Sequence, residues 1–242
     1  MAGIIEMPDE PSGFAVYAHC FTCGKDLKAA VRISRHMAEY PDAQKQMAVL
    51  RFDMTGIGDS RGDFSNTNLT TNCQDIQAAC QFLEQEYRAA VLLMGHSLGG
   101  TAMTLVADQI ESVQALVTLA SPSSTERLAG YLSKTNPAIE SKGEGEVVIG
   151  GRTFLLRKQL LDDLRSHSTE QALQHLQTPI LMFHSPQDET LPYDWGLKMF
   201  EVAGGTKSFV TLDGSDHLFV EQESDTKFIA DTSIVWANRY LS

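Results

Sequence analysis

Residues 90–100 read AVLLMGHSLGG and contain the most informative local pattern of the chain. A short apolar run leads directly into the motif G-H-S-L-G at residues 95–99, and a helical pattern begins at Leu98. This order predicts a sharp strand-to-helix turn that holds Ser97 in a strained backbone conformation with its Oγ exposed. The two glycines of the motif let strand and helix approach closely. We therefore expect Ser97 to act as a nucleophile.

Apolar runs rich in β-branched and aromatic residues alternate with longer amphipathic segments along the rest of the chain. Such alternation predicts parallel strands covered by helices on both faces. The predicted strands are residues 14–19, 47–52, 90–94, 115–120, 180–184 and 208–212. The predicted helices are residues 25–40, 72–88, 98–109, 194–203 and 225–240. The expected fold class is α/β, with a doubly wound, mostly parallel sheet whose ligand chemistry gathers at the strand carboxyl ends.

Residues 121–177 interrupt this alternation, because a plain α/β connection is much shorter. Within them, two β-rich runs flank Gly150 and Gly151, which predicts a two-residue β-hairpin. Ser168 with Gln171 resembles a capping box at the start of a helix. We expect a cap or lid insertion within a single domain spanning residues 1–242, and a lateral decoration of the sheet is the alternative. The apolar underside of a lid would include Tyr131, Leu132 and Phe154.

A serine hydroxyl reacts well only beside a base that a third group orients. His217 lies in the loop after the strand 208–212, and Asp188 lies in the loop after the strand 180–184. Both loops follow strand carboxyl ends, where they can meet Ser97. The sequence therefore predicts a catalytic triad of Ser97, Asp188 and His217.

Other carboxylates and histidines compete for these two roles. Asp216 adjoins His217, and adjacent loop side chains usually point apart; Asp213 would need its turn to fold back. Asp194 suits the start of a helix, where an N-cap role is sufficient. Asp188 is therefore the predicted acid. The remaining histidines have no comparable acid and are interpreted as structural: His19, His36, His96, His167, His175 and His184.

Acyl transfer also needs donors for the oxyanion, and two backbone N–H groups usually supply them. The first is predicted at Leu98, directly after the nucleophile. The second should come from the loop at residues 19–26, which follows the first long strand. Phe21 is the predicted donor in that loop, and the neighbouring Cys20 and Thr22 are the alternatives.

Together these motifs resemble the α/β-hydrolase superfamily over essentially the whole chain. The resemblance rests on the elbow at residues 95–99, the serine–acid–histidine order and residues 51–60, which are similar to the superfamily's glycine-rich loop after its second parallel strand. It implies that Asp53, in that loop, supports the site without reacting. The superfamily's N-terminal strand pair has room here for one strand, near residues 4–7.

A narrower resemblance points to bacterial hydrolases found beside, or fused to, OsmC-like peroxide-reductase domains. It rests on residues 19–23, the Gly-Gly hairpin, residues 159–164 and residues 213–217. This resemblance implies a functional link to an OsmC-like protein, although the chain ends at Ser242 with no fused reductase.

Composition excludes several classes of partner. The chain carries 19 Lys+Arg against 31 Asp+Glu, a net charge of −12, with no long basic cluster, which argues against nucleic acid. No apolar run approaches the roughly 20 residues that a membrane crossing needs. The acidic start, residues 1–11, lacks the features of a secretory signal. We expect a cytoplasmic protein without a membrane partner and make no prediction of its oligomeric state.

The four cysteines give no sign of a metal or redox centre in the sequence. Cys20 and Cys23 form one C-x-x-C, but Cys73 and Cys80 do not provide the second pair that a zinc site needs. We expect four free, unmetallated thiols and no cofactor.

The identity of the nucleophile favours acyl transfer. In the superfamily that this chain resembles, enzymes acting on epoxides and haloalkanes have Asp at the elbow and dienelactone hydrolases have Cys, whereas this chain has Ser97. The leading hypothesis is hydrolysis of a small carboxylic ester or related acyl substrate through an acyl-enzyme. Thioesterase, peptidase, lactonase and perhydrolase chemistry on the same triad remain open. A catalytically silent ligand-binding protein is a second class, and a cysteine-based redox or metal protein is a third.

Overall fold

Within residues 1–241, the part of the chain that the computed structural model describes, seven strands form one sheet in the order β1-β3-β2-β4-β5-β8-β9. All neighbours are parallel except β1 and β3. In sheet order the strands are β1 (Gly3–Glu6), β3 (Met47–Phe52), β2 (Gly13–Ala18), β4 (Leu92–His96), β5 (Ala115–Leu119), β8 (Ile180–His184) and β9 (Lys207–Thr211). The five central strands are buried at every residue, which explains their continuous apolar runs.

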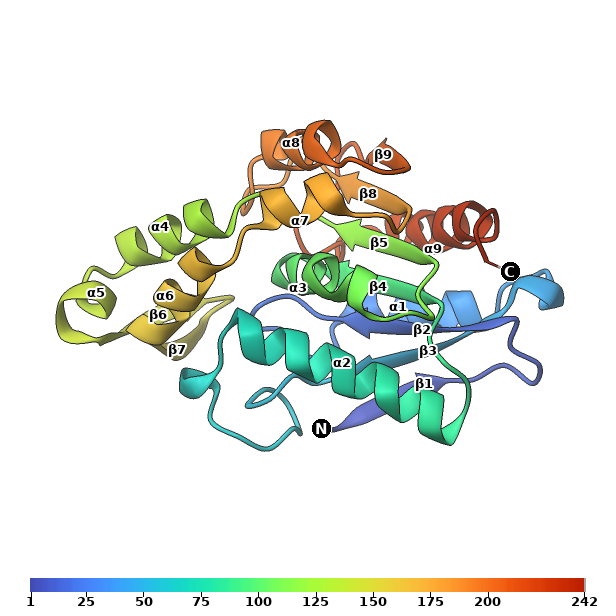
Figure 1. Ribbon diagram of the computed structural model, residues 1–242, viewed down its shortest axis with the longest axis horizontal. Coiled ribbons are helices and arrows are strands. Elements are labelled where there is room, and N and C mark those ends of the chain that lie inside the picture. The colour runs from blue at the N-terminus through green and yellow to red at the C-terminus, as the bar shows by residue number, and fades with distance from the viewer. Residues whose placement is uncertain (242) are drawn as a thin grey trace.

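Helices cover both faces of this sheet (Figure 1). On one face α1 (Lys28–Ala38) packs against α9 (Glu223–Ala237), and on the other α2 (Leu69–Glu86) packs against α3 (Leu98–Val106). The remaining sheet-flanking helix, α8 (Tyr193–Val202), joins β8 to β9. Short 3-10 turns occupy Ala43–Lys45, Phe64–Asn66 and Ala107–Gln109. None of the helices in the described residues is long and apolar enough to cross a membrane.

The predicted α/β class and doubly wound sheet are confirmed. Each predicted strand is present to within two residues, and each predicted helix to within three. β4 begins at Leu92, later than predicted, and extends into the G-H-S-L-G motif as far as His96. The single N-terminal strand predicted near residues 4–7 is β1, which forms the antiparallel edge of the sheet.

The insertion at residues 121–177 is built from helices around a hairpin. In chain order it contains α4 (Thr125–Thr135), α5 (Ala138–Lys142), β6 (Glu144–Ile149), β7 (Arg152–Arg157), α6 (Lys158–Ser166) and α7 (Thr169–His175). The hairpin is confirmed, and both glycines at its turn have the positive φ that such a turn requires. Ser168 caps α7 by accepting from the Gln171 amide. The sequence did not predict α4 and α5, because Gly130 and Pro137 interrupt the helical pattern there.

Most of the insertion, from α4 to α6, lies beyond the carboxyl ends of the parallel strands at the left of Figure 1, whereas α7 packs against α3 and α8. Its leucines on α6 belong to the same buried cluster as α2 and α3. At the start of α2, the Thr67 carbonyl accepts from Gln159 Nε2 at 2.8 Å, and Thr70 Oγ1 donates to Asp163 at 2.6 Å. Tyr131, predicted to face inward, is instead 58% exposed. The insertion is thus fixed beside the strand ends at which the predicted site lies.

Candidate active site

Ser97 lies at the junction of β4 and α3 with φ of 53° and ψ of −123°, a conformation that non-glycine residues rarely adopt. Its N–H donates to the Leu119 carbonyl at 2.8 Å, and its own carbonyl accepts from the Gly100 amide at 2.9 Å. The side chain is partly exposed. The predicted strand-to-helix turn is therefore present, and it stores strain at the serine.

The glycines of the motif are required by close backbone contacts. A Cβ on Gly95 would lie 2.6 Å from the Cα of Gly100. A Cβ on Gly99 would collide with the carbonyl oxygen of His19, at the end of β2. Gly99 therefore lets α3 begin directly against β2, which brings the elbow beside the predicted oxyanion loop.

The predicted acid and base are hydrogen-bonded to each other. His217 Nδ1 lies 2.7 Å from Asp188 Oδ2, and the two side chains are 10% and 1% exposed. The amides of Thr190 and Leu191 donate to the other carboxylate oxygen. Burial alone would raise the pKa of Asp188, but hydrogen bonds from His184 and His217 lower it well below its usual value. The charged acid fixes the His217 proton on Nδ1 and leaves Nε2 as the basic nitrogen.

The competing carboxylates have other structural roles. Asp213 accepts from the Gln187 side chain at 3.1 Å, and Asp194 is an exposed residue in the first turn of α8, not its N-cap as predicted. Asp216 shapes the loop by accepting from the amides of Leu218, Val220 and Glu221. Within the described residues none of these three hydrogen-bonds the His217 ring, whereas Asp188 does.

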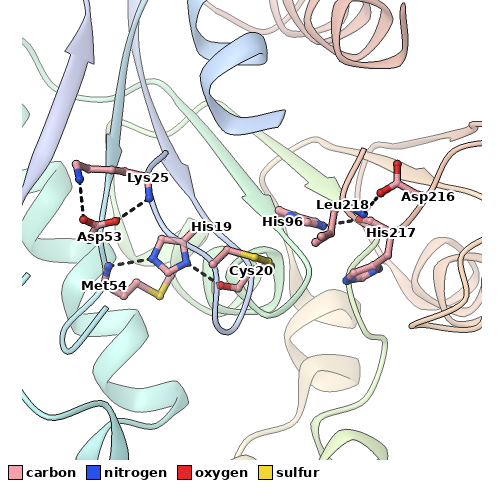
Figure 2. The surroundings of a disulfide bond; sticks show 10 residues. His19, Cys20, Lys25, Asp53, Met54, His96, Asp216, His217 and Leu218 are labelled. Atoms are coloured by element: carbon pink, nitrogen blue, oxygen red, sulfur yellow. Dashed lines mark hydrogen bonds and ion pairs between the residues drawn. A yellow bond between two sulfur atoms is a disulfide. The ribbon is translucent and has the colours of Figure 1, made fainter. Parts of the chain in front are cut away.

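Two buried histidines, His96 and His184, were predicted to have only structural roles. Both lie in contact with the predicted triad. His96 donates from Nε2 to the His217 carbonyl at 2.8 Å (Figure 2), and burial lowers the pKa of His96 to about 3, so its ring is neutral. His184 Nε2 lies 3.1 Å from the Leu191 carbonyl and 3.3 Å from Asp188 Oδ2. Their positions, beside the serine and at the end of β8, were the signal in the sequence that could have identified them.

The loop that carries His217, between β9 and α9 and here called the base loop, lies close to the elbow at Ser97. The ring centroid of His96, the neighbour of Ser97, is 5.1 Å from that of His217. Within residues 1–241, Ser97 Oγ and His217 form no hydrogen bond. Such contacts are often long in a free enzyme and shorten when substrate binds.

The predicted oxyanion donors have free N–H groups. Neither the Leu98 nor the Phe21 amide donates a hydrogen bond to any of the described residues. Leu98 is the first residue of α3, where the helix dipole also favours negative charge. Phe21 lies in the tight turn that follows β2, and its role as the second donor stays a prediction.

An ion cluster centred on the buried pair Lys25 and Asp53 anchors the end of this loop. Asp53 is 1% exposed and accepts from the amide and ammonium of Lys25 at 2.7 and 3.0 Å. Asp59, Asp26 and Asp53 together raise the pKa of Lys25, so the ammonium stays charged. Figure 2 shows this pair beside the oxyanion loop. The contacts of Asp53 are those of a supporting residue, as the family resemblance implied.

Cys20 and Cys23 form a disulfide, so the prediction of four free thiols is wrong for this pair. Residues 21 and 22 form a turn closed by the Cys23 amide and the Cys20 carbonyl, which brings the two Cα atoms to 5.2 Å. A C-x-x-C whose two intervening residues form a tight turn brings its cysteines within disulfide distance without any zinc or redox site. Cys73 and Cys80 are free, and burial raises the pKa of each to about 12, which leaves them unreactive. No group of three or more metal-ligating side chains occurs within residues 1–241.

Residues 36–130 match the protein family described as Serine aminopeptidase, S33. The chain is 36% identical to the esterase domain of a Rhodothermus marinus protein, with a TM-score of 0.77 over 98% of this chain and 92% of that one. Est1E from Butyrivibrio proteoclasticus, solved with ferulic acid bound, superposes with a TM-score of 0.80 over 97% and 94% of the two chains. At 20% identity, that likeness shows the fold alone.

Two curated proteins are also similar to this chain, but the similarity covers a smaller share of their length. Lysophosphatidylserine lipase ABHD12 from Danio rerio is 30% identical over 170 residues, which is 66% of this chain and 40% of the lipase. Protein ABHD12B from Homo sapiens is 30% identical over 162 residues, or 64% and 41% of the two proteins. The chain thus spans about two fifths of the length of these curated relatives.

Proposed function

The chain belongs to the α/β-hydrolase superfamily, and on that premise we propose that it is a serine hydrolase that cleaves a small carboxylic ester or related acyl substrate through an acyl-enzyme. The observation that carries the proposal is the 2.7 Å hydrogen bond between His217 and the buried Asp188, in a chain whose Ser97 lies in a strained elbow. The similarity to an esterase domain at 36% identity favours esters among acyl substrates.

The proposed reaction has two half-reactions, acylation and deacylation of Ser97. Ser97 Oγ attacks the ester carbonyl while His217 Nε2 takes its proton, and Asp188 stabilises the imidazolium. The amides of Leu98 and Phe21 hold the negative oxygen of the tetrahedral intermediate. His217 then protonates the departing alcohol, which leaves the acyl group on the serine. Water attacks this acyl-enzyme with His217 as base and releases the acid.

An active-site probe tests this proposal directly. We expect an alkyl fluorophosphonate to label Ser97 stoichiometrically, with loss of p-nitrophenyl acetate hydrolysis in proportion to labelling, because the base activates this hydroxyl. Mass spectrometry of the peptide containing residues 95–99 identifies the site, and heat-unfolded protein is the control. A silent ligand-binding protein would remain unlabelled and inactive.

The substrate class is a further part of the proposal. Peptide amides are the second candidate, because the matched family is described as a serine aminopeptidase. Panels of p-nitrophenyl esters, thioesters and aminoacyl anilides of graded length separate these chemistries. The proposed link to an OsmC-like protein rests on the motif resemblance, and it makes perhydrolase chemistry a further candidate. An assay of peracid formation from an acyl donor and hydrogen peroxide tests that chemistry.

The insertion is proposed to select the acyl group. The ring centroids of Phe154 and Phe64 are 5.2 Å apart. The ring centroid of Phe64 is in turn 5.4 Å from that of Phe21, on the predicted oxyanion loop. We expect Phe154→Ala to change the ratio of long-chain to acetate turnover by on the order of tenfold, because it opens apolar space beside the site. Phe82→Ala, on the exposed side of α2, is the control. An unchanged chain-length profile would favour a lateral decoration.

A further inference from the structure

We propose that the Cys20–Cys23 disulfide is a positioning element for the oxyanion donor Phe21, so that its reduction slows turnover reversibly. The inference rests on the proposed function, because the Phe21 amide matters only when an oxyanion forms. The two cysteines bracket the donor and Thr22 in a turn of sequence separation 3.

The peptide unit between Cys20 and Phe21 is held from its carbonyl side. The Cys20 oxygen accepts from His19 Nδ1 at 2.7 Å and from the Cys23 amide at 3.2 Å. This peptide is trans, so its carbonyl and its N–H point in opposite directions. Two bonds to the oxygen therefore set the direction of the Phe21 N–H, which has no partner in the described residues.

His19 holds one side of this peptide unit. The ring is 1% exposed, and burial lowers its pKa, so it is neutral at neutral pH. The Met54 amide donates to Nε2 at 3.0 Å, which places the ring proton on Nδ1, toward the Cys20 oxygen (Figure 2). The imidazole thus ties the donor peptide to the chain that follows β3.

The disulfide holds the other side. A crosslink that closes so short a loop removes little entropy from the unfolded chain, so its effect on global stability is small. Its effect on the turn is direct, because Cys23 also supplies the second N–H to the Cys20 oxygen. Reduction replaces a covalent bond with a non-bonded contact, so the sulfur atoms move apart. Phe21 and Thr22, the residues between them, must absorb that movement.

Thiol–disulfide exchange can reach this bond. Cys23 is partly exposed, whereas Cys20 is 5% exposed, so a thiolate of a dithiol reductant attacks the Cys23 sulfur and Cys20 leaves as a thiolate. The second thiol of the reductant then closes its own disulfide and releases Cys23. Two electrons and two protons pass to the protein, and one oxidised dithiol is formed. An excess of oxidised dithiol reverses the step.

The experiment compares the two states of the same protein. Hydrolysis of p-nitrophenyl acetate is measured before and after treatment with dithiothreitol, and alkylation with peptide mass spectrometry reports the state of Cys20 and Cys23. Misplacing one oxyanion donor should lower kcat by about 10- to 100-fold while KM changes little. After removal of dithiothreitol, re-oxidation with oxidised glutathione, confirmed by alkylation, should restore kcat.

A transition-state mimic separates positioning from general loosening. A trifluoromethyl ketone adds to Ser97 to give a hemiketal whose oxyanion needs the same donors. Its inhibition constant should rise on reduction by the factor by which kcat/KM falls. Circular dichroism at the assay temperature confirms that the reduced protein remains folded.

Variants complete the test. Cys23→Ser should show the activity of the reduced protein and no response to dithiothreitol. Cys73→Ser, which removes a free cysteine on α2, should keep both the activity and the redox response. Complete reduction with unchanged kcat and ketone affinity overturns the inference, as does a loss in folded protein that re-oxidation does not restore. In both outcomes fluorophosphonate labelling of Ser97 persists, whereas failure of the proposed function abolishes labelling of the oxidised protein as well.

Discussion

Ser97→Ala is expected to lower kcat for p-nitrophenyl acetate by about 10⁶ while leaving the fold intact, because a triad without its nucleophile retains only the binding and oxyanion contributions. The backbone at this position has φ of 53°, and Ala adopts it no more easily than Ser, so stability should change little. Purified variant and wild type are compared by initial rates and by thermal melting. Ser224→Ala, an exposed serine on α9, should retain full activity.

Glycine at the same position provides a second readout. Ser97→Gly should be equally inactive but should raise stability by about 1 kcal/mol, because glycine relieves the strain of the elbow. A rise in melting temperature with loss of activity would show that strain is maintained there for function. Unchanged turnover in pure Ser97→Ala protein would end the covalent mechanism.

The sheet was predictable because its signal is local. Strands buried on both faces are mostly apolar, and the runs ending at Met94 and His184 differ clearly from the longer amphipathic segments between them. The elbow was a further local signal, because Gly95 is needed where β4 approaches the backbone of α3 and Gly99 is needed where α3 meets the end of β2. Helices α4 and α5 of the insertion were less visible, since Gly130 and Pro137 break their pattern.

The site was predictable only in part, because its remaining contacts join distant segments. The positions of His96 and His184 in the sequence place them near the site, but only folding shows that the first contacts the His217 carbonyl and the second contacts Asp188. The prediction of free thiols at Cys20 and Cys23 was wrong for a different reason. Whether a C-x-x-C closes on itself depends on the turn between the cysteines, and that turn is set by the Cys20 carbonyl accepting from Cys23 and from His19.

Asp188→Asn is expected to lower kcat by about 10⁴. An amide N–H facing His217 Nδ1 shifts the ring proton onto Nε2, and a protonated Nε2 cannot accept the proton of Ser97. The loop should survive, since the remaining amide oxygen can still accept from the Thr190 and Leu191 amides that now bind Oδ1. KM should change much less than kcat. The comparison uses steady-state rates on protein shown to be folded by circular dichroism.

The three competing carboxylates supply matched controls for this assignment. Asp194→Asn and Asp213→Asn, on exposed residues, should cost little. Asp216→Asn is the sharper control, because Asp216 adjoins His217 and its carboxylate accepts from three backbone amides of the base loop. It should cost about 1 kcal/mol of stability through weakened hydrogen bonds but far less activity than Asp188→Asn. A greater loss of kcat in folded Asp216→Asn or Asp194→Asn would move the acid to that residue and leave Ser97 and His217 in place.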